Sequence, residues 1–264
     1  MTTGKIRIGI GGWTYEPWRN SFYPEKLARK RELEYASRQL TSIEVNGTYY
    51  GSQKPESFRK WHDETPEDFV FSLKAPRYAT NRKVLADAGE TIERFLNSGV
   101  ILLGDKLGPI NWQFMATKKF DPGDFEAFLK LLPPSHEGRA LRHVVEVRHD
   151  SFRVPKFIEL IRAHHVAAVV SADGGFPQIA DPTADFVYAR IMGTVEDEPL
   201  GYSPETLDLW AQRARTWAAG GAPERLDHVG DPARSGPRDV YLYVIGGHKA
   251  RNPHAAMALI ERLG

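Results

Sequence analysis

Five side chains that can donate or accept protons follow strand-like runs of this sequence: Glu44, Lys74, Glu146, His149 and Asp173. Acid–base catalysis needs one protonated group beside another that is deprotonated. Neighbouring charges shift the pKa of each group and so decide which of them holds the proton. We predict that these five residues are catalytic. Within the set we expect Glu146 to be the base and His149 or Lys74 to be the acid.

A second group of residues has side chains or backbone suited to holding a substrate. Arg148 and Arg190 are expected to anchor an anion, because guanidinium groups bind carboxylate and phosphate oxygens in pairs. Trp13 and Tyr49 are the rings expected to line the pocket. The predicted substrate-binding residues are Trp13, Asn46, Tyr49, Gln113, Arg148, Arg190, Gly246, Gly247 and His248.

The Gly246-Gly247 pair precedes His248 and the helix start at Asn252-Pro253. Glycine-rich loops next to a helix start often bind phosphate in barrels. A plain turn at these glycines is an equally good interpretation, and both alternatives stay open at this stage.

Alternation along the strand-like runs suggests how the charges are paired. Glu44 and Asn46 share one side, as do Glu146 and Arg148, because successive side chains of a strand point in opposite directions. A buried glutamate needs a cationic partner. Lys74, Arg148 and Arg190 are the expected partners of Glu44, Glu146 and Asp173. Each acid has a structural alternative, and Asp173 before Gly174-Gly175 could simply stabilise a turn.

Other chemistries compete with acid–base catalysis. Glu44, Glu146, Asp173 and His149 could hold a divalent metal, but no close ligand spacing such as HExxH occurs, so we predict no cofactor and keep a metal-dependent hydrolase or isomerase as the alternative. A non-catalytic ligand-binding barrel is a further alternative. Nucleic-acid binding is not expected, because the basic runs at 29–31 and 118–119 are short.

The elements that must position these residues alternate between strand and helix. Eight short apolar runs followed by helical patterns predict one (β/α)8 barrel, and a doubly wound open sheet is the alternative. The predicted strands are 6–10, 42–45, 69–73, 108–114, 143–147, 166–171, 186–191 and 239–244. The predicted helices are 25–40, 55–61, 87–96, 122–132, 154–164, 204–219 and 253–263.

Bulk composition fits one barrel domain over residues 1–264, with an exposed insertion at 220–238 before the last strand. The 264 residues include 35 Lys and Arg against 34 Asp and Glu, and no cysteine. Near-neutral charge favours a small polar or anionic ligand over nucleic acid. No signal-peptide or membrane-spanning run is visible, so we expect a cytoplasmic protein without a membrane partner. Oligomeric state leaves no sequence signal.

Seven short motifs give the chain a family resemblance. It resembles the YecE-like family (domain-of-unknown-function family 72), which implies a TIM barrel and no established activity. The matching motifs are residues 8–15 (IGIGGWTY), 22–24 (FYP), 43–50 (IEVNGTYY), 74–76 (KAP), 107–109 (LGP), 146–149 (EVRH) and 184–190 (ADFVYAR).

Two segments depart from the family pattern. The family typically continues from Gln113 into a leucine-proline-proline turn, whereas this chain has 114–117 (FMAT). The last strand of the family usually ends in an asparagine-rich acidic motif, which 244–248 (VIGGH) replaces here. The second change removes amide and carboxylate groups from the expected pocket, and with them any activity that depends on those groups.

Overall fold

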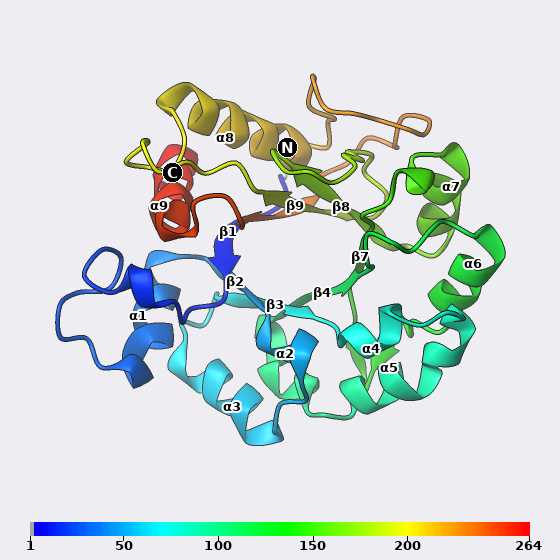
Figure 1. Cartoon of the computed structure of the whole chain (residues 1–264), viewed down its shortest axis with the longest axis horizontal. Helices are drawn as coiled ribbons and strands as arrows, with labels where there is room; N and C mark the ends of the chain where they lie inside the picture. Colours follow the sequence, from blue (N-terminus) through cyan, green and yellow to red (C-terminus); the bar gives the residue numbers. More distant parts are fainter. Residues whose placement is uncertain (1–2) are drawn as a thin grey trace.

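Eight strands pair side by side into a closed parallel barrel in the computed structural model, which describes residues 3–264. The order around the barrel is β1-β10-β9-β8-β7-β4-β3-β2, so neighbouring strands follow one another along the chain (Figure 1). This confirms the predicted (β/α)8 barrel. The barrel strands are β1 Ile6–Gly11, β2 Ser42–Val45, β3 Val70–Lys74, β4 Leu107–Gln113, β7 His143–Glu146, β8 Ala167–Ala172, β9 Phe186–Ile191 and β10 Asp239–Val244.

Helices surround the barrel and bury their apolar faces against it (Figure 1). The predicted helix at 25–40 is too long, because Lys26 has a φ of 72° and the chain becomes α-helical only at Glu32. The α-helices are α1 Glu32–Gln39, α2 Gly47–Tyr50, α3 Pro55–Glu64, α4 Arg77–Thr80, α5 Gly89–Leu96, α6 Pro122–Lys130, α7 Pro155–Ala163, α8 Pro204–Ala218 and α9 Asn252–Leu263. A two-residue hairpin, β5 Ser135–His136 with β6 Arg139–Ala140, lies outside the barrel.

Within residues 3–264, no helix combines the length and the apolar character that a bilayer crossing requires.

The connection between β8 and β9, residues 173–185, contains no helix. A segment from later in the chain, which we call the strap (residues 220–238), packs beside it and against α7. The Arg162 side chain of α7 donates a hydrogen bond to the Asp231 carbonyl, and both carboxylate oxygens of Asp181 accept from strap amides. Most strap residues are exposed, but Leu226 and Arg238 are buried. The strap therefore covers part of the region where the sixth helix of a regular barrel would lie.

The barrel interior changes from apolar to charged along the strand direction. On β9 the inward residues are Phe186, Tyr188 and Arg190 in that order, and β7 places Val144 below Glu146. A separate cluster of buried apolar side chains fills the lower half of the barrel: Val70, Val144, Ala167, Val169, Phe186, Tyr188, Tyr241 and Tyr243. The charged residues are thus held above a packed floor, at the carboxyl ends of the strands.

Candidate active site

Two fully buried glutamates share one arginine at the carboxyl end of the barrel. Arg190 of β9 donates from one nitrogen to Glu146 (2.7 Å) and from another to Glu44 (3.3 Å). Both carboxylates have no exposed surface, and Arg190 is 3% exposed. The inward alternation of β2, β7 and β9 brings these three side chains together, as the pairing prediction required.

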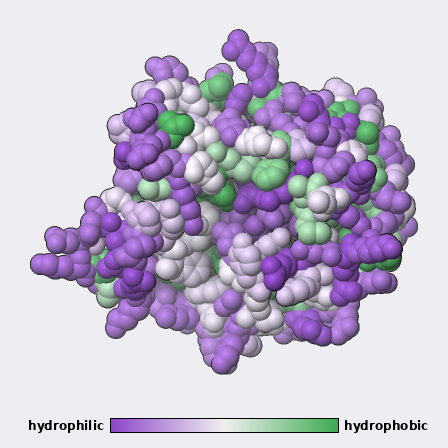
Figure 2. Space-filling model, in the orientation of Figure 1, coloured by the Kyte–Doolittle hydropathy of each residue, from purple (hydrophilic) through white to green (hydrophobic). Residues whose placement is uncertain are grey.

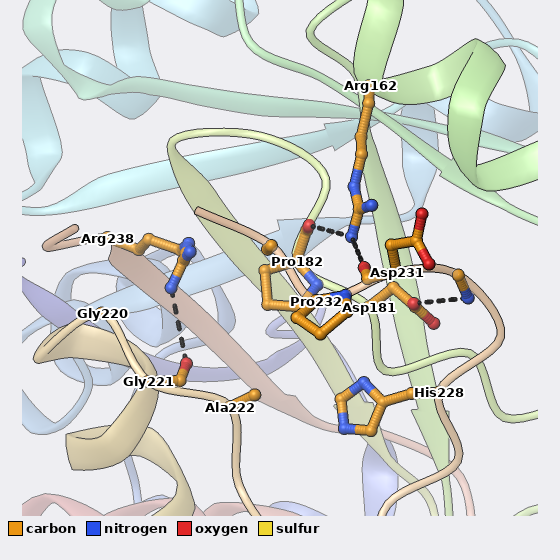
Figure 3. A pocket seen from close by; sticks show the side chains of 12 residues that line it. Arg162, Asp181, Pro182, Gly220, Gly221, Ala222, His228, Asp231, Pro232 and Arg238 are labelled. Carbon is orange, nitrogen blue, oxygen red and sulfur yellow. Dashed lines mark hydrogen bonds between the residues drawn. The ribbon is translucent and has the colours of Figure 1, made fainter. Parts of the chain in front are cut away.

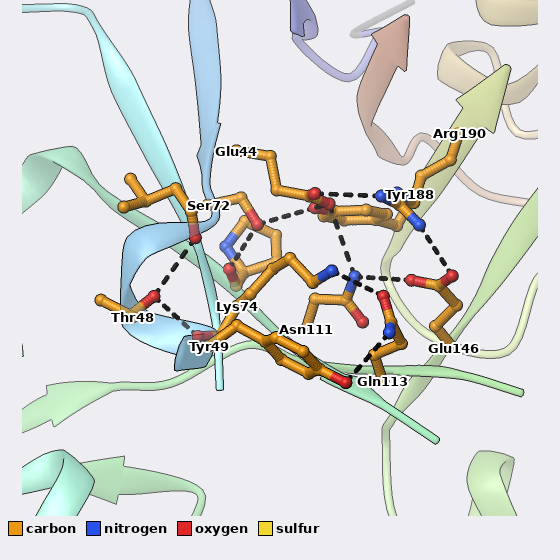
Figure 4. A network of polar contacts seen from close by, with 12 residues as sticks. Glu44, Thr48, Tyr49, Ser72, Lys74, Asn111, Gln113, Glu146, Tyr188 and Arg190 are labelled. Carbon is orange, nitrogen blue, oxygen red and sulfur yellow. Dashed lines mark hydrogen bonds and ion pairs between the residues drawn. The ribbon is translucent and has the colours of Figure 1, made fainter. Parts of the chain in front are cut away.

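Two further cations surround the carboxylates. Arg148 donates to Glu146 at 2.6 Å and to the Gln113 Oε1 atom at 2.9 Å. Lys74 does not pair with a carboxylate as expected; its Nζ atom donates to the same Gln113 oxygen at 2.6 Å and lies 4.5 Å from the centre of the Tyr49 ring. We call Glu44, Lys74, Gln113, Glu146, Arg148 and Arg190 the mouth network (Figure 4).

Three residues below the network are functional candidates that the sequence reasoning missed. The Tyr188 hydroxyl donates to Glu44 at 2.6 Å and contacts the Ser72 hydroxyl at 2.9 Å. The Asn111 amide donates to Glu146 (3.2 Å) and to Glu44 (3.4 Å). Each lies two residues before a predicted site residue on the same strand, so period-two alternation would have found them.

The balance of charge explains the ionisation of the network. Burial alone would raise the pKa of Glu146, but the charges of Arg190, Arg148 and Lys74 outweigh it and hold the pKa at about 2. Burial lowers the pKa of Lys74, and the charge of Glu44 offsets this only in part. Glu146 therefore stays ionised near neutral pH, and Lys74 is the cation of the network whose pKa is lowered by burial.

Several buried polar atoms around the network have no hydrogen-bond partner among the described residues. They are Asn111 Oδ1, Ser171 Oγ and Arg190 Nε. Buried polar atoms are nearly always satisfied, by the protein, by water or by a ligand. The centre of the face above them is hydrophilic and hollowed (Figure 2). These three atoms therefore keep an unused capacity for hydrogen bonding at the carboxyl end of the barrel.

Asp173 does not belong to the network, which corrects its assignment as a catalytic residue paired with a cation. Its backbone has a φ of 59°, and its carboxylate accepts from Tyr202 (3.3 Å) and the Trp210 indole (3.2 Å). The reversed backbone turns the side chain towards α8 and away from Arg148 and Arg190. Asp173 thus joins the end of β8 to Tyr202 and to Trp210 of α8, and its side chain makes no hydrogen bond to the Gly174-Gly175 turn.

His149 and Trp13 also have local partners that differ from the expected ones. The Nδ1 atom of His149 accepts from the Ser151 amide at 3.1 Å, so the ring caps the turn after β7. Trp13 stacks edge-on against Trp61 of α3 with ring centres 5.3 Å apart, outside the barrel wall. Trp13 is thus a packing residue, whereas Tyr49 does reach the network, where its hydroxyl accepts from Gln113.

The glycine pair after β10 forms a tight turn against the β9–α8 connection. Gly246 and Gly247 have φ values of 81° and 53°, and a Cβ atom on Gly247 would lie 2.5 Å from the Thr194 carbonyl. The His248 amide donates to that same carbonyl at 2.7 Å. Asn252 also faces Thr194, whose hydroxyl donates to it at 2.8 Å. The turn alternative thus accounts for the conformation, and no contact joins it to the network.

Asn46 and Ile245 complete the rim on the β1 side. Both lie close to Gly11, within 3.0 Å and 3.6 Å of the position that a Cβ atom there would take. Asn46 is half-buried and its side chain makes no hydrogen bond within residues 3–264. It is free to bind a ligand, while Ile245 makes the β10 sector of the rim apolar.

The metal alternative loses its predicted ligand set. His149 and Asp173 are engaged elsewhere. Arginine binds the Oε1 atom of Glu44 and of Glu146, and both Oε2 atoms accept from the Asn111 amide. Across residues 3–264, no three histidine or acidic side chains gather as a metal site would need.

Comparisons with known proteins agree with this fold. The profile of the family described as "Protein of unknown function DUF72" matches residues 7–264. The Escherichia coli K12 protein YecE is 30% identical over 150 residues, which cover 56% of this chain and 50% of that protein. The Bacillus subtilis protein YunF is 36% identical over 70 residues, covering 26% of this chain and 24% of that protein. The chain thus spans half or less of the curated relatives it matches.

Solved structures extend the likeness to the whole fold. A DUF72 family protein from Thermotoga maritima has a TM-score of 0.74 at 23% identity, over 98% of this chain and 99% of that one. Another from Enterococcus faecalis has a TM-score of 0.71 at 15% identity, over 100% and 99%. The closed barrel and the profile match over nearly every residue lead to one conclusion: this chain is a member of the DUF72 family.

Proposed function

We propose that the mouth network binds a small, polar, anionic substrate of sugar-like character and that Lys74 exchanges a proton with it. The observation that carries this proposal is the pairing of excess positive charge with unsatisfied buried polar atoms. While Lys74 is protonated, as it would be before it gives up its proton, three cations, Lys74, Arg148 and Arg190, face only two carboxylates. A barrel needs neither the extra charge nor the unpaired atoms for stability.

The anion is expected to bind beside Arg148. The side chain of Arg148 is 21% exposed, whereas its partner Glu146 is fully buried, so the guanidinium presents its outer edge to the mouth. The ring of Phe176 stacks 4.2 Å from this guanidinium and fixes its plane. The Gln113 amide lies beside it, with its oxygen 2.9 Å from the guanidinium. Asn46 lies on the β1 side of the rim, and both amides suit the hydroxyl groups of a sugar-like molecule.

The proton transfer falls to Lys74 because the other candidates are unsuited. Glu146 has a pKa of about 2 and binds protons too weakly to act as a base near neutral pH. The Tyr188 hydroxyl has a pKa raised well above its usual value, mainly by burial and by Glu44, so it stays protonated and supports Glu44 as a donor. A buried lysine with a lowered pKa can take a proton from carbon next to a carbonyl and return it, as isomerases and lyases require.

A solvent-exchange experiment tests this proposal. Sugar acids and small carboxylates that raise the melting temperature would be incubated with the protein in D2O, and NMR would follow deuterium entry at carbon. We expect exchange with the wild type and a loss of at least 100-fold for Lys74→Gln, in line with the usual contribution of a general acid or base. Lys60→Gln, on the exposed face of α3, is the matched control.

The outcomes separate catalysis from binding. Full exchange by Lys74→Gln would refute the role of Lys74. Ligands that stabilise the wild type without any exchange would refute the enzyme and favour the non-catalytic binding barrel. A rate that rises with pH as the amine loses its proton would support Lys74 as the base.

A further inference from the structure

Two adjoining cavities lie between the strap and the barrel, at the end opposite the mouth. Their volumes are about 290 and 560 Å3, and they share Arg162, Pro182 and Arg238 among their lining residues. Figure 3 shows the smaller of the two. Pro182 precedes β9, His165 precedes β8, and Arg238 precedes β10. We call this region the strap groove. It borders the amino-terminal ends of three strands.

Two of the three arginines that line the strap groove, the buried Arg238 and the half-buried Arg162, have no acidic partner among the described residues. Arg238 is 6% exposed and donates to the carbonyls of Gly221 and Arg234. Arg162 donates to the carbonyls of Pro182 (3.3 Å) and Asp231 (2.8 Å). Within residues 3–264, neither guanidinium lies within 4.0 Å of a carboxylate oxygen. Burying a charge without a counter-ion is costly, so the groove has an unmet need for negative charge.

The acids that line the groove do not meet this need. Both oxygens of the Asp181 carboxylate accept from strap amides, those of Val229 (2.8 Å) and Gly230 (2.9 Å). Asp231 is exposed and offers Arg162 its carbonyl only. The larger cavity contains Arg162, His165, Arg234 and Arg238 and no acidic residue. Burial and the nearby charge of Arg162 lower the pKa of Arg238.

We infer that the strap groove is a binding site for a small oxyanion of the phosphate or sulfate class, held between Arg162 and Arg238. Two guanidinium groups offer paired N–H donors to the oxygens of a tetrahedral anion, which is the geometry that arginine binds best. The anion would supply the missing counter-charge and tie the strap to α7 and to the β8–β9 connection. This site is independent of the function proposed for the mouth.

Calorimetric titration with inorganic phosphate tests the site. We expect Arg238→Met and Arg162→Met each to weaken binding at least tenfold, the effect of losing one charge-assisted contact. Arg153→Met is the matched control, because Arg153 pairs with strap residue Asp227 outside the cavities, and it should change binding less than twofold. Equal binding by Arg238→Met and Arg153→Met would overturn the inference.

A crystal soaked in selenate locates the anion directly and separates this site from the mouth, which also carries positive charge. An anomalous selenium peak between Arg162 and Arg238 supports the inference, and a wild-type crystal with no peak there overturns it. Titration with glycerol phosphate then distinguishes two sources of the same group. Tighter binding than inorganic phosphate identifies an ester as the ligand, and weaker or equal binding identifies the free anion; both support the site.

Discussion

Arg190 at the mouth and Arg238 at the strap groove are almost equally buried, with 3% and 6% of their surface exposed. Arg190 binds two carboxylates, whereas Arg238 binds backbone carbonyls only. The first charge is balanced inside the protein and so holds the barrel interior together. The charge of Arg238 has no acidic partner within residues 3–264, so an anion bound from solution would balance it. The degree of burial therefore does not distinguish an arginine that stabilises the fold from one that binds a ligand. The distinction lies in whether its partners are charged carboxylates or neutral carbonyls.

The substitution Arg190→Met tests this difference between the two arginines most strongly. It leaves two carboxylates in the barrel with fewer cations to balance them, so we expect the free energy of unfolding to fall by about 3–5 kcal/mol. Urea unfolding at neutral pH measures this, with the exposed Arg59→Met as control. A loss below about 1 kcal/mol would mean that Arg190 does not balance the glutamates.

The pH dependence of stability tests whether the ionised Glu146 in the mouth network stabilises the fold. The folded pKa of Glu146, about 2, lies below its ordinary value of 4.5, so its contribution is complete above pH 4.5 and is lost as the pH falls through 2. We expect a loss of up to about 3 kcal/mol across that window, part of it measurable by urea unfolding between pH 6 and pH 3. Glu146→Gln should flatten the profile, and Glu56→Gln on the exposed face of α3 should not.

On the groove side, Arg238→Met should have little effect on stability. Replacing an unbalanced buried cation by an apolar side chain of similar length removes a desolvation cost and two contacts to carbonyls. We expect the free energy of unfolding to change by less than about 1 kcal/mol in phosphate-free buffer, measured by urea unfolding. A loss as large as that of Arg190→Met would make both arginines structural and end the contrast.

The smallest effect is expected for Arg153→Met. Its ion pair with Asp227 joins the connection between β7 and α7 to the strap, but the two side chains are 43% and 55% exposed, where solvent screens the attraction. We expect a change below about 0.5 kcal/mol by thermal or urea unfolding. A larger loss would show that this pair, rather than the groove arginines, fastens the strap.

Sequence patterns predicted the barrel and the centre of the mouth network because both follow from alternation. The eight apolar runs match the eight barrel strands to within one residue at either end. Glu44, Glu146 and Arg190 met as expected, since the inward direction is fixed once the strand is known. Alternation applied one step further down β4 and β9 would also have given Asn111 and Tyr188.

The missed assignments all lie where alternation ends. Asp173 turns away because its φ is positive, and His149 caps the turn that follows its strand. Trp13 lies beyond β1, where the direction of a ring depends on which helix packs there. The strap groove was not predictable, because it forms between segments about 70 residues apart in sequence and the strap has no periodic pattern. The conformation of a loop and the packing of distant segments cannot be predicted from the types of individual residues in one sequence.

The packed side chains in the lower half of the barrel determine how a molecule can enter and leave the site. Tyr188 and Tyr243 stack with ring centres 5.0 Å apart, and below them the interior is filled by Val70, Val144 and Phe186. Neither water nor ions cross such a packed apolar layer easily. The barrel interior is therefore open at the carboxyl end of the strands and closed by packed side chains below. In the proposed function a substrate and its product would use the same opening, so the product would compete with the substrate for entry.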